Sequence, residues 1–276
     1  MRIVPLAFWK YQGLGNDFVV VEAAELMTAA AAARLCDRRR GVGADGVLSV
    51  LAPRDGGVAY MHIYNSDGSV AAMCGNGIRC VARHLAERRG LAGELAIETD
   101  AGVKRCLVHR TDAGDVESVS VEMGPARHEG EQEFALGGER LRAHRVSMGN
   151  PHAVFFGEAS RDRATRLGPL VESAVPGGVN AGFAAPRGSG LDLVVWERGA
   201  GLTDACGTGA CAAAVAAIKA GVLRAGEPLE VRLPGGALQI TVAPDLVGVR
   251  MRGPAERVFE GLVKLGPDDG RIEPGP

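Results

Sequence analysis

Two short segments combine a cysteine with glycines in a way that could do acid–base chemistry. They are residues 73–80, MCGNGIRC, and residues 205–211, ACGTGAC. Glycine lowers helix stability, yet an apparent helix follows each cysteine, so we expect Cys74 and Cys206 at helix N-caps. The first amides of a helix have no intrahelical partner, and glycines let a ligand approach them closely. Each segment therefore predicts a sulfur base beside an anion-binding helix end.

A pair of such helix ends would suit one type of reaction. The helix dipole is expected to lower the pKa of an adjacent thiol from its usual value of about 8.5. If two ends face one α-amino acid, both hold its carboxylate and each places a sulfur on one face of the α-carbon. One thiolate removes the α-proton, and the other thiol delivers a proton to the opposite face. This arrangement predicts racemisation or epimerisation. No lysine motif for pyridoxal phosphate is evident, so we expect no cofactor and no metal.

The two cysteine segments belong to a longer internal duplication. Cys74 and Cys206 lie 132 positions apart, and so do Asn65 and Glu197, which each follow an apolar-aromatic pair. Two further landmarks recur in the same order, with offsets of 134 and 136 residues: Gly15-Asn16 with Gly149-Asn150, and Gly46-Val47 with Gly182-Phe183. Four landmarks in register predict two homologous halves.

The pattern of apolar residues predicts an α+β protein. Strands are expected from β-branched content and alternation at residues 17–23, 59–64, 117–123, 191–197, 229–233, 238–242 and 247–251. Helices are expected at 28–39, 75–89 and 207–220. We expect two pseudo-symmetric halves, each mainly antiparallel sheet around a central helix, with the active site in the cleft between them. The domains are placed at 1–122 and 123–261, with a strand at about 262–276 returning to the first.

Composition excludes several classes of protein. The chain of 276 residues is 46% hydrophobic, enough for two cores, and its net charge of −2 does not favour nucleic acid or an anionic membrane. No apolar run approaches the roughly 20 residues of a membrane helix, and the first ten residues lack the features of a secretory signal. Six cysteines in a chain of this length do not indicate a disulfide framework. A cytoplasmic location is the simplest interpretation.

Taken together, these motifs resemble one family, the diaminopimelate epimerases. The resemblance covers essentially the whole chain and rests on eight segments in order: FWKYQGLGNDFVVV, GVGADGVL, YNSDGS, MCGNGIRC, SMGNPHAV, VNAGF, ERGAG and ACGTGACAA. It implies interconversion of LL- and meso-diaminopimelate in the synthesis of lysine and peptidoglycan precursors. The implied partner is this small-molecule substrate, and homodimerisation is left open.

The resemblance also implies roles for individual residues. Cys74 and Cys206 would be the catalytic acid/base pair. The reacting carboxylate would be bound by Gly75, Asn76, Gly207 and Thr208. The rest of the substrate, chiefly its distal amino-acid end, would be fixed by Asn16, Asn65, Asn150, Asn180, Glu197 and Arg198. His152 and Glu197 would help to set the protonation of the thiols. Arg198 suits a distal carboxylate chemically, because a guanidinium binds carboxylates in a bidentate manner.

Two positions depart from the family pattern. Leu202 follows ERGAG where a glutamate is usual, and Gly46 stands where some members have glutamine. The remaining cysteines, Cys36, Cys80, Cys106 and Cys211, are expected to be buried small apolar residues. The cluster at residues 38–40, three arginines, is expected to be a solvated helix end.

Two alternative functions remain open. One is a related two-thiol racemase or epimerase for proline or hydroxyproline, although a cyclic imino acid has no distal zwitterion for Arg198 to bind. The other is a thiol redox or metal-binding protein. The cysteine spacings, C-x5-C and C-x4-C, fit a zinc site poorly.

Overall fold

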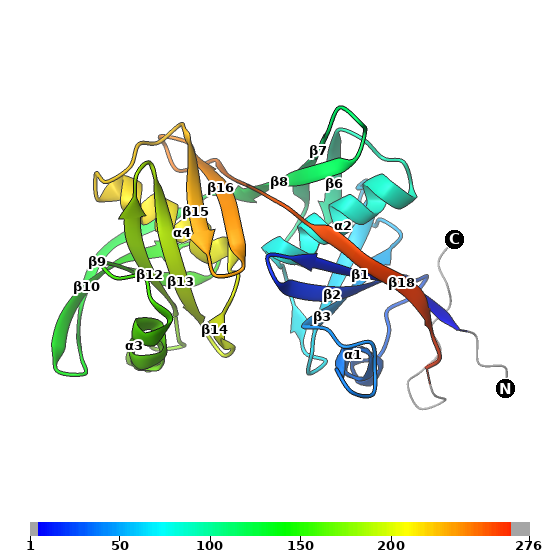
Figure 1. The fold of residues 1–276 in the computed structure, drawn as a ribbon, viewed down its shortest axis with the longest axis horizontal. Helices are drawn as coiled ribbons and strands as arrows, with labels where there is room; N and C mark the ends of the chain where they lie inside the picture. The colour runs from blue at the N-terminus through cyan, green and yellow to red at the C-terminus, as the bar shows by residue number, and fades with distance from the viewer. Residues whose placement is uncertain (1–4, 266–276) are drawn as a thin grey trace. The chain divides into compact units, whose positions relative to one another are not determined.

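Contacts within the chain divide it into two units. The structure is a computed structural model that describes residues 5–265 (Figure 1). Unit 1 contains residues 5–121 and 254–265, and unit 2 contains residues 122–253. Unit 2 is thus continuous in the sequence and interrupts unit 1. No helix in the described range is long and apolar enough to cross a membrane.

Unit 1 is a sheet wound around a helix. Its elements are β1 (Leu6–Gly13), β2 (Asn16–Glu22), α1 (Ala29–Cys36), β3 (Gly46–Leu51), β4 (Ala59–Asn65), β5 (Val70–Ala71), α2 (Gly75–Arg88), β6 (Glu94–Glu98), β7 (Lys104–Arg110), β8 (Val116–Gly124) and β18 (Glu256–Val263). The last three residues of β8 belong to unit 2. The strands follow the order β18-β1-β2-β3-β4-β6-β7-β8, and only the β2–β3 and β4–β6 pairs are parallel. Strand β18 pairs with β1. It shares only residues 262–263 with the strand predicted at about 262–276, and the predicted residues beyond 265 lie outside the described residues.

Unit 2 repeats this topology. Its elements are β9 (Arg127–Leu136), β10 (Glu139–Ser147), β11 (Pro151–Phe156), α3 (Arg161–Ala174), β12 (Asn180–Arg187), β13 (Gly190–Glu197), β14 (Gly201–Thr203), α4 (Gly207–Lys219), β15 (Pro228–Leu233), β16 (Gly236–Val242) and β17 (Val249–Gly253). The strand order is β9-β10-β11-β12-β13-β15-β16-β17, again with two parallel pairs, β11–β12 and β13–β15. The expected α+β fold of two pseudo-symmetric halves is confirmed.

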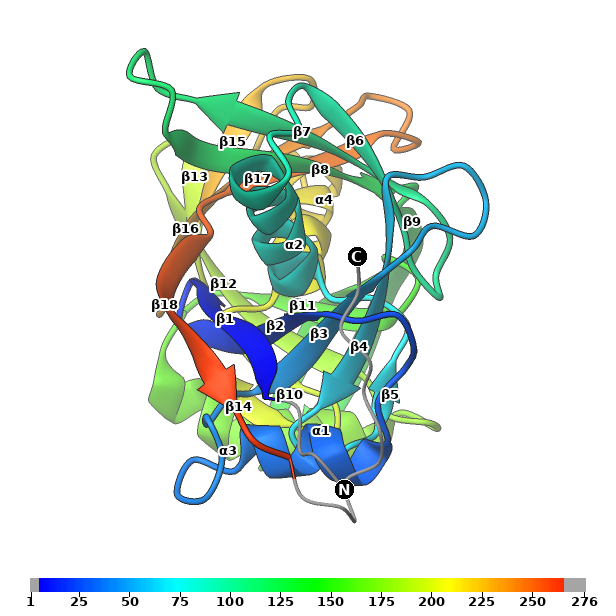
Figure 2. The same cartoon turned by 90° about the vertical axis from the view of Figure 1, so that its right-hand side faces the viewer.

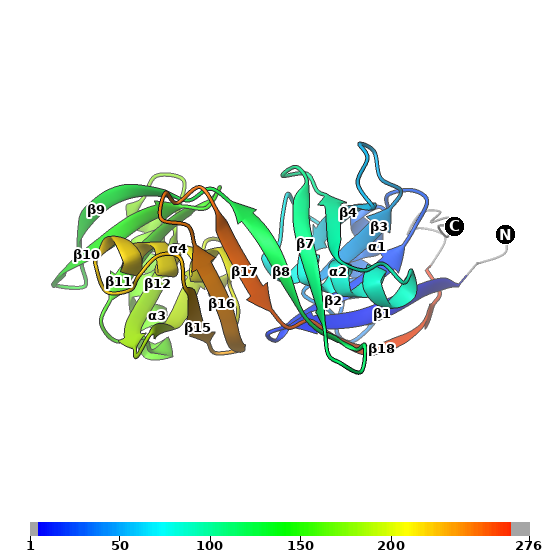
Figure 3. The ribbon, with the colours of Figure 1, turned by 90° about the horizontal axis from the view of Figure 1, so that it is seen from above.

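The strands of each unit surround one helix. Helix α2 packs against β1, β2, β3, β6, β7 and β18 (Figure 2). Helix α4 packs against β10, β11, β12, β13 and β16 (Figure 3). The alanine-rich α4 is buried nearly all round, because small side chains let strands approach it from several directions.

A second helix in each unit covers the outer face of the sheet. Helix α1 contacts β3 and β4 over a buried cluster that includes Leu35 and Val47. Helix α3 contacts β12 and β13 over a cluster that includes Leu167 and Phe183. The sequence predicted α1, α2 and α4 but missed α3. Gly168 and Pro169 lie inside it, and both residues are poor helix formers.

The prediction for the first helix was too long. Helix α1 begins after the Thr28 N-cap and ends at Cys36 rather than at residue 39, because Asp37 adopts an extended conformation and closes it. The arginines at 38–40 therefore lie in a turn after the helix. The Asp37 carboxylate accepts the N–H groups of Arg39 and Arg40 at 2.8 Å and stabilises this turn. The arginine cluster is not a helix end, and Arg38 has a different role described below.

Candidate active site

Both predicted cysteines cap their helices. Cys74 precedes α2 with φ −137° and ψ 119°, and Cys206 precedes α4 with φ −128° and ψ 104°. In each unit the third helical residue, Gly77 or Gly209, donates its N–H to the sulfur at 3.4 Å. An N–H directed at sulfur from a helix start favours the thiolate. The predicted N-caps are confirmed in both units.

The glycines at the third position allow this close approach. A Cβ added to Gly77 would lie 3.0 Å from Leu48 Cδ2. A Cβ added to Gly209 would lie 3.1 Å from both Cys206 Sγ and Val195 Cγ2. A larger residue would therefore be tighter than ordinary packing at both positions, and a neighbouring side chain would have to shift by a few tenths of an ångström. This steric limit explains why a glycine follows each cysteine by three residues.

In unit 1, amide side chains surround Cys74. The sulfur is half-buried and lies 4.0 Å from Asn16 Oδ1. Asn76, which is buried, donates its Nδ2 to the same oxygen at 3.3 Å. The buried Arg79 donates to Asn76 Oδ1 at 3.0 Å and to the carbonyl oxygen of Gly75 at 3.1 Å. Three polar residues thus position the first turn of α2 beside the sulfur.

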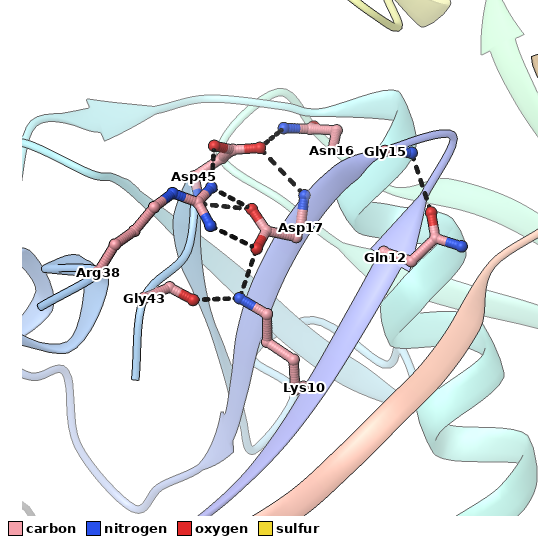
Figure 4. A network of polar contacts seen from close by, with 8 residues as sticks. All are labelled: Lys10, Gln12, Gly15, Asn16, Asp17, Arg38, Gly43 and Asp45. Atoms are coloured by element: carbon pink, nitrogen blue, oxygen red, sulfur yellow. Dashed lines mark hydrogen bonds and ion pairs between the residues drawn. The ribbon is translucent and has the colours of Figure 1, made fainter. Parts of the chain in front are cut away.

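A charged cluster holds Asn16 from its other side (Figure 4). Asp45 Oδ2 accepts from Asn16 Nδ2 at 2.9 Å, and Asp45 Oδ1 accepts from Arg38 Nη2 at 2.8 Å. Arg38 also contacts both carboxylate oxygens of Asp17, which pairs with Lys10 at 2.6 Å. Burial alone would raise the pKa of Asp17, but hydrogen bonds from Arg38 and Lys10 hold it well below its ordinary value.

Cys206 in unit 2 has a different environment. Its sulfur is buried and lies 3.7 Å from Thr208 Oγ1. Burial raises the pKa of the Cys206 thiol well above its ordinary value, and the Glu197 charge raises it further, whereas Gly209 and Thr208 lower it. The N–H group at the helix start thus lowers the pKa of Cys206 as expected, but the net shift is upward. Desolvation of the buried sulfur outweighs the helix end.

Glu197 is the acidic neighbour of this thiol. Its Oε1 accepts from Thr203 Oγ1 at 2.7 Å. Burial raises the pKa of Glu197, although hydrogen bonds from Thr203 and Cys206 act in the opposite direction. A carboxylate that accepts a hydrogen bond from an S–H group stabilises the neutral thiol and opposes the thiolate. Glu197 therefore contributes, after burial, to the raised pKa of the Cys206 thiol.

His152 lies nearby as a neutral side chain. It is buried, and burial, with a smaller contribution from the Arg198 charge, lowers its pKa to about 3. Its Nε2 lies 3.0 Å from Asn150 Oδ1, so this nitrogen carries the hydrogen and donates to the amide oxygen. Asn150 in turn donates its Nδ2 to Thr208 Oγ1 at 3.3 Å. His152 thus acts on the start of α4 through Asn150 and Thr208.

The remaining predicted site residues are placed as follows. Asn180 is buried and accepts the N–H of Arg198 at 3.0 Å, while its own Nδ2 donates to the Pro151 carbonyl oxygen at 3.0 Å. The exposed Arg198 side chain donates to the Gly177 carbonyl oxygen at 3.0 Å. Asn65, at the end of β4, is exposed and donates to Ser69 Oγ at 2.9 Å. Asn180 and Arg198 therefore form one local assembly in unit 2.

The two departures from the family pattern have structural explanations. Leu202 in β14 pairs with Trp196 of β13 and packs against the apolar cluster under α3. At the first residue of β3, a Cβ added to Gly46 would lie 2.6 Å from the Tyr64 carbonyl oxygen, so this backbone leaves no room for a larger side chain. The first substitution extends a core, and the second permits close pairing of β3 with β4.

The other cysteines are buried, as predicted. Burial raises the pKa of Cys36 to about 11 and that of Cys80 and Cys106 to about 12, and Cys211 is fully buried. Within residues 5–265, no group of three or more His, Cys, Asp or Glu side chains is arranged to hold a metal ion.

Sequence reasoning did not assign roles to Asp45, Arg38 and Arg79. Asp45 and Arg79 lie inside two of the motifs that carry the family resemblance, GVGADGVL and MCGNGIRC. Their position inside these motifs was the available signal that Asp45 and Arg79 have a role. The residues that Asp45 and Arg38 contact lie too far away in the sequence to be identified without the structure. Arg38 reaches Asp17 across 21 residues, and Asp45 reaches Asn16 across 29.

Comparisons with known proteins show the family of the chain. A family model described as diaminopimelate epimerase matches residues 8–129 and 145–258. A diaminopimelate epimerase of Synechococcus sp. (strain JA-3-3Ab) is 42% identical, over 93% of this chain and 97% of that protein. A chloroplastic diaminopimelate epimerase of Oryza sativa subsp. japonica is 39% identical, over 93% of this chain and 79% of that protein.

Solved structures share the fold at low sequence identity. A hydroxyproline epimerase from Agrobacterium vitis has a TM-score of 0.76 and 17% identity, covering 95% of this chain and 92% of that one. A probable proline racemase from Agrobacterium radiobacter K84 has a TM-score of 0.74 and 18% identity, covering 96% and 94%. These two structures show a common fold, whereas the family model and the sequence relatives identify the family. The chain belongs to the diaminopimelate epimerase family and is an isomerase.

Proposed function

We propose that the protein interconverts LL- and meso-diaminopimelate by transferring protons between the α-carbon and two thiols. The observation that carries this proposal is the recurrence of one cysteine-capped helix start in both units, at Cys74 and Cys206. Membership of the family indicates the substrate, and the two capping cysteines indicate proton transfer as the chemistry. No cofactor takes part in the proposed proton transfer.

The proposal requires both helix ends to bind the same substrate molecule. The reacting carboxylate would lie against the amides of Gly75 and Asn76 on one side and those of Gly207 and Thr208 on the other. Helix N-termini favour anions, and this preference strengthens as the α-carbon loses its proton and negative charge spreads into the carboxylate. The two sulfurs would then lie on opposite faces of the α-carbon.

The surroundings of the sulfurs support one starting state. Burial and Glu197 favour the protonated thiol at Cys206, while Cys74 is half-buried and receives an N–H from Gly77. In this state the Cys74 thiolate takes the α-proton as the C–H electron pair moves into the carboxylate. The Cys206 S–H bond then breaks, and its proton forms the new C–H bond on the opposite face. The products are a Cys74 thiol and a Cys206 thiolate, ready for the reverse direction.

The distal end of the substrate would be recognised by the remaining polar residues. Arg198 would pair with the distal carboxylate, and Glu197 with carbonyl oxygens would accept the distal ammonium. The amides that complete this set are Asn16, Asn65, Asn150 and Asn180. A proline-type substrate has no distal zwitterion, so these residues favour diaminopimelate over the cyclic imino acids.

The biological setting follows from this activity. The protein would act in the cytoplasm, in the synthesis of lysine and peptidoglycan precursors, as a monomer or a homodimer. All six cysteines are free, which suits a reducing compartment. The catalytic thiols would need such a compartment to stay active.

One assay tests the function directly. LL-diaminopimelate is incubated with purified protein and reductant but no added cofactor, and the LL and meso forms are separated by chromatography. The meso form should appear until both isomers reach equilibrium. Cys74→Ala, prepared in the same way, is the control for a contaminating enzyme. Epimerisation of proline or hydroxyproline but not of diaminopimelate would overturn the proposal, and an inactive protein that binds stoichiometric metal would favour the metal-binding alternative.

A further inference from the structure

A line of hydrogen bonds in unit 1 passes beside Cys74. Arg79 Nη2 donates to Asn76 Oδ1 at 3.0 Å, and Asn76 Nδ2 donates to Asn16 Oδ1 at 3.3 Å. Asn16 Nδ2 then donates to Asp45 Oδ2 at 2.9 Å. The line thus joins a guanidinium to a carboxylate through two amide side chains.

The charged ends determine how both amides are oriented. An asparagine side chain can place either its oxygen or its NH₂ group toward a neighbour, so its orientation depends on its partners. A guanidinium only donates, so the oxygen of Asn76 must face Arg79. A carboxylate only accepts, so the NH₂ group of Asn16 must face Asp45. The oxygen of Asn16 is then the atom left to face Asn76 and Cys74.

Both ends of the line are themselves held in place. Asp45 accepts from Arg38 at 2.8 Å and from the backbone N–H of Asp17 at 3.1 Å (Figure 4). Arg79 is fully buried and also donates to the carbonyl oxygens of Gly75 and Pro254, each at 3.1 Å. Neither end can turn freely, so the orientation of the line is stable.

The consequence for Cys74 is a carbonyl oxygen in front of its sulfur. Asn16 Oδ1 lies 4.0 Å from Sγ, where it accepts a hydrogen bond from the S–H group of a thiol and repels a thiolate. The N–H of Gly77 at 3.4 Å has the opposite preference. The charged and titratable groups tied to this region by contacts or electrostatics are Lys10, Asp17, Arg38, Asp45, Arg79, Cys80 and Arg83.

We propose that Asp45 is a positioning residue for Cys74: through the Asn16 amide it keeps a carbonyl oxygen, rather than an N–H group, in front of the sulfur. A protonated Cys74 thus has a hydrogen-bond partner, while the Gly77 N–H serves the thiolate. This balance lets Cys74 act as the base in one direction of the reaction and as the acid in the other. The inference deepens the proposed function, since it rests on proton transfer at Cys74.

The test measures the reactivity of Cys74 itself. The unmodified protein, Asp45→Ala, Asn16→Ala and the double variant are alkylated with iodoacetamide over a range of pH, and each cysteine is quantified by peptide mass spectrometry. In Asp45→Ala the Asn16 NH₂ group is released, so the Cys74 profile should move to lower pH. Loss of one hydrogen bond to the thiol corresponds to an increase of about threefold to tenfold in the alkylation rate at neutral pH.

Two controls distinguish a change in the orientation of the Asn16 amide from a general change in cysteine reactivity or stability. Cys206 lies in the other unit, and its alkylation in the same samples should not change. Glu94→Ala removes an exposed ion pair with Arg105 in unit 1, with both side chains more than half exposed, and should leave the Cys74 profile unchanged. Circular dichroism confirms that each variant is folded.

The double variant decides whether Asp45 acts through Asn16. If it does, Asp45→Ala adds no shift in the Asn16→Ala background. An equal shift in both backgrounds would mean that the Asp45 charge acts through space, and an unshifted Asp45→Ala profile would also overturn the inference. If Asp45→Ala does not fold, Asp45→Asn replaces it. Asp45→Asn has a single side-chain oxygen, which the guanidinium of Arg38 requires, so its NH₂ group faces Asn16 and the Cys74 profile should move to lower pH, as in Asn16→Ala. An unshifted Asp45→Asn profile would overturn the inference. Epimerase activity is measured separately, so failure of the proposed reaction and failure of this inference give different results.

Discussion

Helices α2 and α4 begin in the same way and lie in different surroundings. At each start a cysteine caps the helix, a glycine follows three residues later, and its N–H meets the sulfur at 3.4 Å. Cys74 is half-buried among amide side chains, while Cys206 is buried beside Glu197. The cap geometry is local and therefore repeats, whereas the burial of the sulfur and the polar groups around it come from other elements and differ between the units.

The difference continues along the helices. At the offset of 132 residues that relates the cysteines, Arg79 and His84 of α2 correspond to Cys211 and Ala216 of α4, and all four are fully buried. Helix α2 thus carries a buried cation and a buried imidazole where α4 carries only small side chains. Polar groups position α2, while close packing of small side chains positions α4.

The largest expected effect comes from removing either sulfur. Cys74→Ala and Cys206→Ala should each reduce epimerisation by about 10²–10⁴-fold, because every turnover needs an acid and a base. Removal of the α-proton by the remaining cysteine should persist in each variant. A β-halogenated substrate analogue can lose its α-proton and then halide without being reprotonated. Each variant should therefore release halide from only one α-configuration, and the two variants should prefer opposite configurations.

Halide release from both isomers with both variants is the measurement. Cys211→Ala, which removes a buried thiol from the same helix as Cys206, is the matched control and should keep its activity. If one variant processes both isomers and the other processes neither, a single base is at work and the two caps are not equivalent in function.

The next effect concerns binding by unit 2 alone. Arg198 corresponds by the same offset to Ser66, so at this position unit 2 carries a guanidinium and unit 1 does not. Arg198→Ala should lose about 2–4 kcal/mol of transition-state binding, measured as a fall in kcat/KM for diaminopimelate. Lysine, which lacks this carboxylate, should be a poor substrate of the unmodified protein. Comparable turnover of lysine and diaminopimelate would refute the assignment.

A smaller effect is expected from neutralising Glu197. The carboxylate raises the pKa of Cys206, so Glu197→Gln should lower that pKa and speed alkylation of Cys206 at a given pH. Activity should fall by about tenfold, in line with the loss of one charge-assisted hydrogen bond. Alkylation of Cys74 in the same samples is the control. An unchanged Cys206 profile would show that burial alone sets its protonation.

The smallest effect tests the polar support of α2. His84 Nε2 and Arg89 each lie 2.8 Å from the Glu22 carboxylate. The hydrogen bond from His84 lowers the pKa of Glu22, burial opposes it, and Arg89 adds to the lowering, which brings the pKa from 4.5 to about 2. A lowered pKa stabilises the fold above the unfolded value. The contribution is full above about pH 4.5 and is lost as the pH falls toward 2.

Glu22→Gln should therefore destabilise unit 1 by about 1.5 kcal/mol at neutral pH and have little effect near pH 2. Urea unfolding can be followed by the fluorescence of Trp9 in a Trp196→Phe background, since Trp9 lies in unit 1 and Trp196 in unit 2. Glu94→Gln, on an exposed ion pair of the same unit, is the control. A difference that persists at low pH would argue against titration of Glu22.

The sequence allowed prediction of features that depend on neighbouring residues. The two caps, the strands with alternating or β-branched residues and the family itself were all predictable. Helix α3 was missed because Gly168 and Pro169 conceal its pattern. The glycine is required there, since an added Cβ would lie 2.4 Å from Trp196 Cγ.

Features that depend on tertiary contacts were not predictable. The sequence places Arg38 after a helix-forming run, but its partners Asp17 and Asp45 meet it only when β2 and β3 pair. The raised pKa of Cys206 depends on burial and on Glu197, nine residues earlier in the sequence. Local propensity determines where a helix begins, and the assembled core determines how its first residues ionise.

The pairing of β1 with β18 has a consequence for synthesis on the ribosome. Unit 2 is encoded without interruption, so its strands can assemble while the chain is still growing. Strand β1 emerges first, yet its partner β18, Glu256–Val263, is among the last described residues to leave the ribosome. Until then one edge of β1 has no strand beside it, and unpaired edges are sites where chains aggregate. A nascent chain that stalls before residue 256 would carry a complete unit 2 and a unit 1 with this edge exposed.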